Sequence, residues 1–316
     1  MGFTTIISQI SFLAILSICG IIAFRFKVLN NSAKDVIEKL VFYVTLPLLI
    51  ITKLSSLSFT SEILRNGLFI LFGTYLVLFL QILAGKLSAR IFKLKQSQAS
   101  VHILHTTFGN IVFLGFPLLD ALFPGGEAIL YAGIFQLAQN TVTWTYGIHI
   151  LNPASKEKGL KNLKKLLNPN IIALCLGLVM MAFRIQFPQI IQAPLQGLGK
   201  TTIYLSMIYI GILMAQIKIK EMINSFNVFV LSINKLILLP IIFIFLFRFL
   251  INVFNLQINN IAFSVLILEA SMPCMAILVI LAKRYGADDK LAMKNFFVST
   301  VISLVSLPLI LYLLQL

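Results

Sequence analysis

Ten apolar runs, each close to the length that a helix needs to cross a bilayer, make up most of this 316-residue chain. A hydrocarbon core about 30 Å thick needs roughly 20 mainly apolar residues in a helix. The chain is 59% apolar and only 11% charged, which is typical of polytopic membrane proteins. We therefore expect an all-α membrane protein with ten transmembrane helices, at about 5–24, 36–54, 64–86, 99–122, 127–150, 169–187, 198–217, 225–251, 259–282 and 291–314.

Lysine and arginine mark one side of the predicted membrane. Nineteen of them lie in or beside alternate connections, and only five fall on the opposite side. Short cytoplasmic loops carry such an excess, so the bias predicts that both termini are extracytoplasmic. The net charge of +15 is thus explained by topology, and nucleic acid is not an expected partner. The nineteen are Arg25, Lys27, Lys34, Lys39, Lys86, Arg90, Lys93, Lys95, Lys156, Lys158, Lys161, Lys164, Lys165, Lys218, Lys220, Lys283, Arg284, Lys290 and Lys294.

A polar linker divides the chain into two similar halves. We expect a first five-helix repeat at 1–150, a cytoplasmic linker at 151–168 and a second repeat at 169–316. Because five is odd, the second repeat should be inverted relative to the first. Pro117 and Pro273 are 156 residues apart, and Asn140 and Asn295 are 155 apart, which supports a repeat.

The fourth and ninth spans are interrupted at corresponding places, by Gly115-Phe116-Pro117 and by Ser271-Met272-Pro273. Proline removes a backbone donor and kinks or opens a helix. An opened helix survives in a membrane only where protein buries it or where it lines a wet cavity. Paired breaks in an inverted repeat are the best sequence pointer to a transporter's binding site, so we expect helices 4 and 9 to be proline-broken and to cross. The alternative is that these are kinks without a ligand, as Pro47, Pro240 and Pro308 are expected to be.

Three charged residues lie at membrane depth. Glu269, four residues before Pro273, is the candidate coupling group, since it could carry a proton or coordinate a cation, and the alternative is a structural cap. Lys235 is expected to extend to the cytoplasmic interface; the alternatives are that it balances an anionic substrate or pairs with Glu269. Asp120, close to the outer end of span four, is expected to be an interfacial or cap residue.

Neutral polar residues flank both breaks and suit either a carboxylate ligand or helix–helix contacts. We favour a binding site. Its candidate substrate-binding residues are Asn110, Gly115, Phe116, Pro117, Gln136, Asn140, Ser271, Met272, Pro273 and Asn295.

Several common functional motifs are missing. Gly199-Lys200-Thr201 resembles the end of a phosphate-binding loop, but Pro194 stands where its first glycine belongs. Cys19, Cys175 and Cys274 show no metal spacing, and no paired nucleophile and base are visible. His102 and His105 are expected to pack at the interface. We therefore predict no enzymatic activity, no metal and no cofactor, with H⁺ or Na⁺ as candidate coupling ions.

Taken together, the motifs resemble those of the auxin efflux carrier family of bacterial permeases. This family is related to the PIN-type auxin carriers and, more distantly, to the bile-acid/sodium symporters. The similarity covers the whole chain, and one departure is Phe116, where PIN-type carriers often have Asn before the crossover proline. The resemblance is carried by Thr45-Leu46-Pro47, Gly109-Asn110, Gly115-Phe116-Pro117-Leu118, the segment from Gln136 to Asn140, Asn168-Pro169-Asn170, Ser271-Met272-Pro273 and the segment from Asn295 to Thr300.

The resemblance implies a ten-helix inverted-repeat fold with crossing helices 4 and 9 and elevator-like movement of a transport domain against a scaffold. It also implies an organic-anion substrate such as a carboxylate, a bacterial inner or plasma membrane location, and a homodimer. The predicted function is a secondary transporter for a small organic anion. The main alternative is a membrane receptor or sensor that binds a small ligand without moving it, and a membrane-embedded hydrolase is a third.

Overall fold

The computed structural model describes residues 3–152, 167–216 and 226–315. Most of the predicted linker, together with Lys218 and Lys220, lies outside these residues. Within them the chain is helical, and an antiparallel bridge between Gly109 and Cys274 is the isolated β-type pairing. Helices occupy each of the ten ranges that hydropathy predicts.

Two predicted spans are split in the middle, one in each half of the chain. In the first half the helices are α1 (Phe3–Arg25), α2 (Asn31–Leu40), α3 (Leu46–Leu54), α4 (Ser61–Ile91), α5 (Gln96–Thr107), α6 (Phe116–Leu122), α7 (Glu127–Val142) and α8 (Ile148–Leu151). In the second they are α10 (Pro169–Phe183), α11 (Gln189–Ala215), α13 (Phe226–Ile233), α14 (Leu239–Val253), α15 (Asn260–Ala270), α16 (Ile277–Arg284) and α17 (Asp289–Gln315).

Side-chain caps define where several of these helices begin. The side chains of Asn30, Thr60, Asn168 and Asn259 accept hydrogen bonds from backbone N–H groups in the first turns of α2, α4, α10 and α15. The first N–H groups of a helix have no partner within it, so such residues set its start.

Turns of π-helix join several helix pairs into longer rods. They are η1 (Val41–Thr45) before α3, η2 (Ile111–Gly115) before α6, η3 (Thr143–Gly147) between α7 and α8, and η5 (Asn234–Leu238) before α14. Three of them precede a proline: Pro47, Pro117 and Pro240 each lie in the first turn of the helix that follows. A wider turn accommodates the absent proline N–H without opening the helix.

The prediction that span four breaks at Pro117 is therefore wrong. The N–H of Phe116 donates to the carbonyl of Ile111, so the chain remains helical up to the proline. The break lies earlier, at Phe108, Gly109 and Asn110. In span nine the break covers residues 271–276 and contains Pro273, as the sequence predicts.

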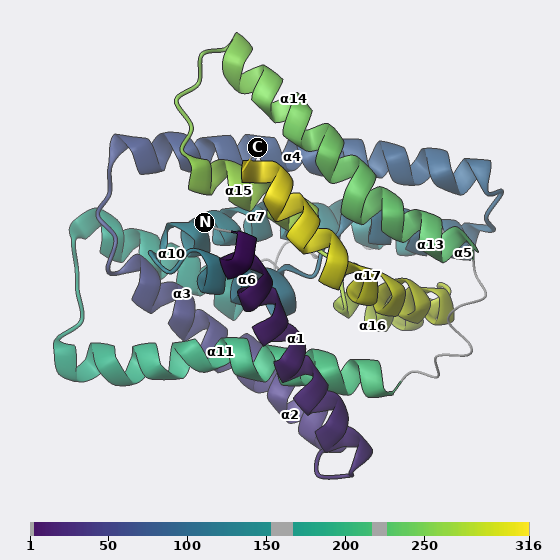
Figure 1. Ribbon diagram of the computed structural model, residues 1–316, viewed down its shortest axis with the longest axis horizontal. Coiled ribbons are helices and arrows are strands. Elements are labelled where there is room, and N and C mark those ends of the chain that lie inside the picture. Colours follow the sequence, from purple (N-terminus) through teal and green to yellow (C-terminus); the bar gives the residue numbers. More distant parts are fainter. Residues whose placement is uncertain (1–2, 153–166, 217–225, 316) are drawn as a thin grey trace.

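The helices form two groups (Figure 1). The flanking group contains α1, α2, η1, α3, α10 and α11, and α11 packs along both α1 and α3. The crossing group contains α4 to α8 and α13 to α17, in which α4 packs on α5, α7 and α15. Contacts of α1 with α6 and α17, and of α3 with α7, join the two groups.

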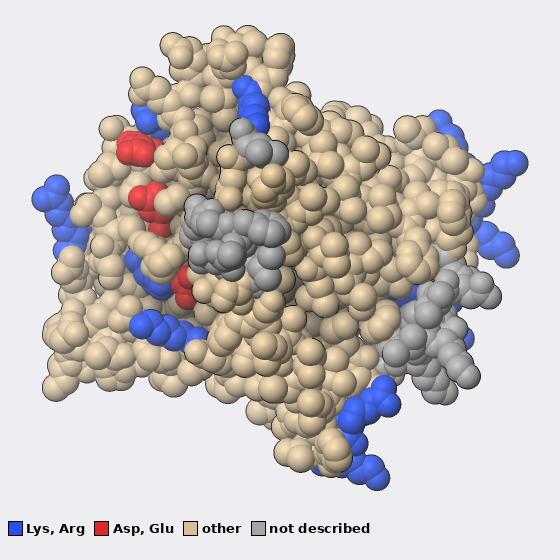
Figure 2. All heavy atoms as spheres, viewed as in Figure 1, with Lys and Arg blue, Asp and Glu red and all other residues tan. Residues whose placement is uncertain are grey.

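Much of the outer surface is apolar. Among the described residues, five helices are long and apolar enough to cross a membrane by length and composition: α1, α4, α11, the rod 226–253 and α17. Large side chains such as Phe72 and Phe245 are each 68% exposed on α4 and α14, which water would not favour. Figure 2 shows most Lys and Arg towards the two ends of the long axis and at the lower tip of the molecule, with a broad uncharged area in the middle of this face. These features are those of a protein embedded in lipid.

Candidate functional site

The two breaks pair with each other through their backbones. The N–H of Asn110 donates to the carbonyl of Pro273 at 2.8 Å, and the N–H of Met275 donates to the carbonyl of Phe108 at 3.2 Å. A Cβ atom added to Gly109 would lie 2.9 Å from the Cβ of Met272, so the close approach of the two chains needs glycine there. The breaks satisfy part of each other's hydrogen bonding, as buried backbone requires.

The span after each broken span, α7 in the first half and α17 in the second, holds the break with a polar side chain. Gln139 of α7 forms two hydrogen bonds with Gly109: its Oε1 accepts from the N–H at 3.0 Å, and its Nε2 donates to the carbonyl at 3.1 Å. In the other half, Ser299 of α17 accepts from the N–H of Cys274 at 3.0 Å. Each break is thus fixed at its central residue.

Side chains from α4 and η5 reach the ends of the half-helices. Gln81 donates to the carbonyl of Ala270, the last residue of α15, at 3.0 Å. Lys235 donates to the carbonyl of Thr106 in the last turn of α5 at 3.1 Å. The prediction that Lys235 extends to the interface is wrong, because its side chain is fully buried. It caps the opened helix instead.

His105 is also buried at the crossing rather than at the interface. Its Nε2 donates to the carbonyl of Met275 at 3.2 Å, and its own carbonyl accepts from the Sγ of Cys274 at 3.6 Å. The described residues contain no cluster of three or more His, Cys, Asp or Glu side chains.

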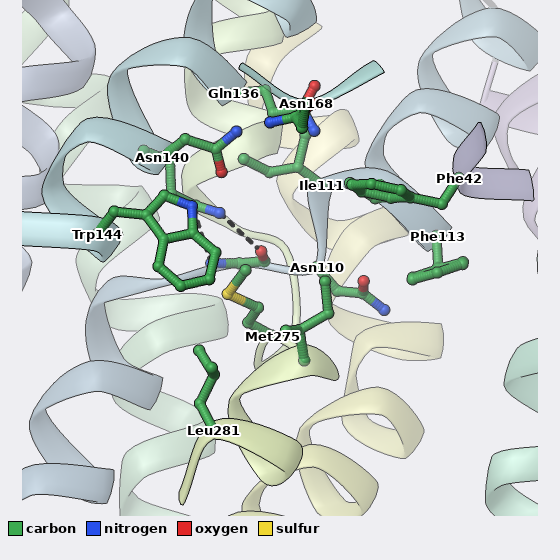
Figure 3. Close-up of a pocket in the computed structure, with 14 residues that line it drawn as sticks. Phe42, Asn110, Ile111, Phe113, Gln136, Asn140, Trp144, Asn168, Met275 and Leu281 are labelled. Carbon is green, nitrogen blue, oxygen red and sulfur yellow. Dashed lines mark hydrogen bonds between the residues drawn. The ribbon is translucent and has the colours of Figure 1, made fainter. Parts of the chain in front are cut away.

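A pocket of about 70 Å³ lies against the break of span four. Gln136, Asn140 and Asn168 gather at one end, Met275 and Leu281 form the other, and Trp144 lies along one side (Figure 3). Phe42 lies in η1 of the flanking group and Asn168 caps α10 of the same group, and the other lining residues belong to the crossing group. The lining residues are Phe42, Gly109, Asn110, Ile111, Val112, Phe113, Gln136, Gln139, Asn140, Trp144, Asn168, Met275, Ile277 and Leu281.

Two buried polar atoms in this pocket have no hydrogen-bond partner: Nδ2 of Asn110 and Oε1 of Gln136. Both side chains are only 3% exposed. Buried polar groups are normally satisfied, so an orphaned donor and an orphaned acceptor in one cavity indicate a place for a polar ligand or water.

Comparison with known proteins assigns the family. The model of a family described as "Membrane transport protein" matches residues 5–311. The chain belongs to this family, that of the auxin efflux carriers. The resemblance noted in the sequence is therefore confirmed.

Two relatives agree with this assignment. The uncharacterized transporter MJ1031 of Methanocaldococcus jannaschii is 28% identical over 302 residues, which cover 93% of this chain and 94% of the relative. The uncharacterized transporter YfdV of Escherichia coli is 24% identical over 233 residues, covering 71% and 70%. The chain is thus a multi-pass integral membrane protein of a transporter family, and it is not an enzyme.

Within this member of the auxin efflux carrier family, three predicted site residues line the pocket: Asn110, Gln136 and Asn140. The others lie outside its lining. Ser271, Met272 and Pro273 form the second break, and Asn295 is buried in α17 with both side-chain polar atoms unpartnered. Gly115, Phe116 and Pro117 lie in the rod that follows the first break.

Glu269 lies beside this rod and not in the pocket. A Cβ added to Gly115 would lie 2.5 and 2.7 Å from its two carboxyl oxygens. Neither oxygen has a hydrogen-bond partner, and the residue is 1% exposed. Asp120 forms an ion pair with Lys53 at 2.6 Å near the end of the same rod.

Sequence reasoning missed Gln139, Trp144 and Phe42. Gln139 lies between Gln136 and Asn140 in a helix with several polar residues, and spacing alone does not tell which of them faces the broken backbone. Trp144 is the chain's one tryptophan, which could have singled it out. Phe42 comes from a segment distant in the sequence, and no sequence feature marks it as a site residue.

Proposed function

We propose that this protein is a secondary carrier that moves a small organic anion across the membrane by elevator-like alternating access. The position of the pocket carries the proposal. Unwound backbone of the crossing forms one wall, and residues of both helix groups complete it. A ligand in this place contacts both groups, so a displacement of one group against the other would carry it across.

The membrane topology in this proposal is ten transmembrane helices arranged as a 5+5 inverted repeat, with helices 4 and 9 crossing. The repeats are 1–150 and 169–316. Reciprocal contacts support it, since Gln139 and Ser299 lie in the fifth helix of their halves and each holds the central residue of its own break. The positive-inside count puts both termini outside a bacterial plasma membrane.

The chemistry of the pocket favours an anion held by neutral donors. Asn110 presents an unpartnered Nδ2. The helical run Ile111–Leu122 begins beside it, and the N–H of Leu114 donates to the carbonyl of Asn110 at 3.1 Å. The N–H groups of residues 111–113 therefore lack acceptors within the helix, and this end of a helix favours negative charge.

The size of the pocket favours a short carboxylate. On a comparable scale one water needs roughly 10–15 Å³. A cavity of about 70 Å³ in this conformation has room for a few water-sized groups and is about half the roughly 150 Å³ of an engineered cavity that holds benzene. An aromatic auxin would need a wider pocket.

Flux in proteoliposomes tests the proposal. The wild-type protein should exchange radiolabelled short mono- and dicarboxylates, and Asn110→Ala and Pro273→Ala at equal protein level should reduce the flux. Asn252→Ala, on an exposed part of α14, is the matched control. Full flux in both site variants would refute the site. Saturable binding without counterflow would favour the receptor or sensor alternative.

Glu269 is the proposed coupling group. Its carboxyl is buried with no partner, so a bound proton or cation would satisfy it. Glu269→Gln has nearly the same volume and cannot take up a proton. If the carrier is proton-coupled, flux in this variant should no longer respond to an imposed pH gradient. An unchanged response would remove Glu269 from the coupling step.

Cysteine labelling tests the orientation. In a Cys19→Ser/Cys175→Ser background, Lys27→Cys should react with an impermeant maleimide only from the cytoplasmic side, and Ser58→Cys only from outside. Both positions are exposed in the structure. The opposite pattern would invert the proposed topology.

A further inference from the structure

Lys235 is a fully buried lysine with no carboxylate beside it. Its exposed fraction is 0%, and in the described part of the chain the ion pairs are Lys34–Asp35 and Lys53–Asp120. Glu269, the buried carboxyl near the crossing, makes no hydrogen bond or ion pair with it. A buried charge in a membrane protein is expensive and normally has a partner or a function.

The ammonium group lies at the carbonyl end of half-helix α5. Its Nζ donates to the carbonyl of Thr106 at 3.1 Å. The last carbonyls of a helix have no intrahelical partners and carry the negative end of its dipole. In carriers with discontinuous helices, such ends coordinate Na⁺ or H⁺. In this chain an amino group of the protein occupies that position.

The equivalent position in the other half carries no charge. Gln81 of α4 donates to the carbonyl of Ala270 at the end of α15, as Lys235 does to Thr106 at the end of α5. Both donors lie in the third helix of their repeat, and each reaches across to the broken helix of the other repeat. The two contacts are alike in geometry and differ in charge.

We infer that Lys235 is the fixed cation of the crossing, which takes the place of a soluble coupling cation at α5 and makes the pocket lined by the nearby Gly109 and Asn110 selective for anions. The inference rests on the proposed transport function and deepens it. The two half-helix C-termini, α5 and α15, bring partial negative charge to the crossing, and the N-termini of η2 and α16 bring partial positive charge. The ammonium group adds a full positive charge to these partial charges. An anion in the pocket then supplies the negative partner that Lys235 lacks.

Thermal unfolding of the purified full-length protein tests the fixed charge without any substrate. Melting temperatures are measured in choline, sodium, potassium and methylammonium chloride at about 0.15 M. The wild type gives the baseline for each salt, since a cation bound at Glu269 would stabilise wild type and variant alike. Lys235→Met should melt lower in choline and recover by about 2–4 °C in sodium or methylammonium, because the vacated position binds a small cation.

Gln81→Met is the matched control. It removes the mirror-image hydrogen bond to Ala270 but no charge, so it should lose stability without any salt-specific recovery. Equal behaviour of Lys235→Met and Gln81→Met, or a sodium stabilisation of the wild type as large as that of Lys235→Met, would overturn the inference.

Lys235→Gln covers the case in which Lys235→Met does not fold. Glutamine can keep a donor towards Thr106, as Gln81 does towards Ala270, while the charge is lost. Its carboxylate flux should show a KM raised by about tenfold with little change in melting temperature in choline. Wild-type KM in this variant would overturn the charge role. If the wild type itself transports no carboxylate, the proposed function fails, while the unfolding measurements still decide the role of Lys235.

Discussion

Gly115 and Glu269 are in direct contact at the crossing, where the α-carbon of one faces the carboxyl group of the other. A Cβ at position 115 would lie 3.0 Å from the carboxyl carbon and closer still to both oxygens. The residue before Phe116-Pro117 is thus a glycine for a steric reason: the acid of α15 occupies the space that a side chain would need.

Gly115→Ala should therefore destabilise the protein and impair transport. Over-packing of a close-packed interior costs about 1–3 kcal/mol, and the displaced group here is the proposed coupling carboxyl. The measurements are the melting temperature and carboxylate flux. Gly197→Ala in α11 is the control, since a Cβ there meets nothing within 4 Å. Equal effects of the two substitutions would argue against the contact.

Gln139→Ala should loosen the first break. The substitution leaves the N–H and carbonyl of Gly109 without their side-chain partner, at a cost of about 1–3 kcal/mol for each buried group. A lower melting temperature and reduced flux are expected. Gln216→Ala removes an exposed glutamine that bonds Asn31 and should leave both values unchanged. Full activity in Gln139→Ala would show that the break does not need this support.

Pro117→Ala and Pro273→Ala should differ. Pro117 follows a π turn inside a continuous rod, so alanine fits there and transport should persist. Pro273 lies in the second break, where its carbonyl accepts from Asn110, and an alanine N–H at this position favours re-formation of helix. Flux at matched protein level is the measurement. A larger loss for Pro117→Ala would place the functional break where the sequence alone suggested it.

Exchanging the charges of Lys53 and Asp120 should restore the transport activity that is lost when either charge alone is reversed. The pair joins α3 of the flanking group to α6 of the crossing group at 2.6 Å, and both side chains are largely buried. An elevator-like displacement must separate it, so Lys53→Asp and Asp120→Lys should each alter flux. The double variant should recover towards wild type, as a double-mutant cycle of coupled residues does. Additive losses would show that the two charges act independently.

The sequence predicted the location of Asn110, Gln136 and Asn140 near the break, because polar residues inside apolar spans are few and point to a site. It misplaced Lys235 because snorkelling is the common behaviour of a lysine ten residues into a span. Only the pairing with Thr106 of a helix more than a hundred residues away explains why this lysine remains buried.

Hydropathy and the Lys/Arg distribution determined the ten helical ranges, since lipid requires long apolar helices and charged loops record which side they face. Tertiary structure decided where span four opens. A π turn accommodates Pro117 without a break, and the helix opens instead at Gly109. There Pro273, Cys274 and Met275 pair with the opened backbone, and the absence of a side chain at Gly109 allows the two segments to approach closely. Local residue types show that a helix can break, but the broken backbone is stable only where another segment satisfies it.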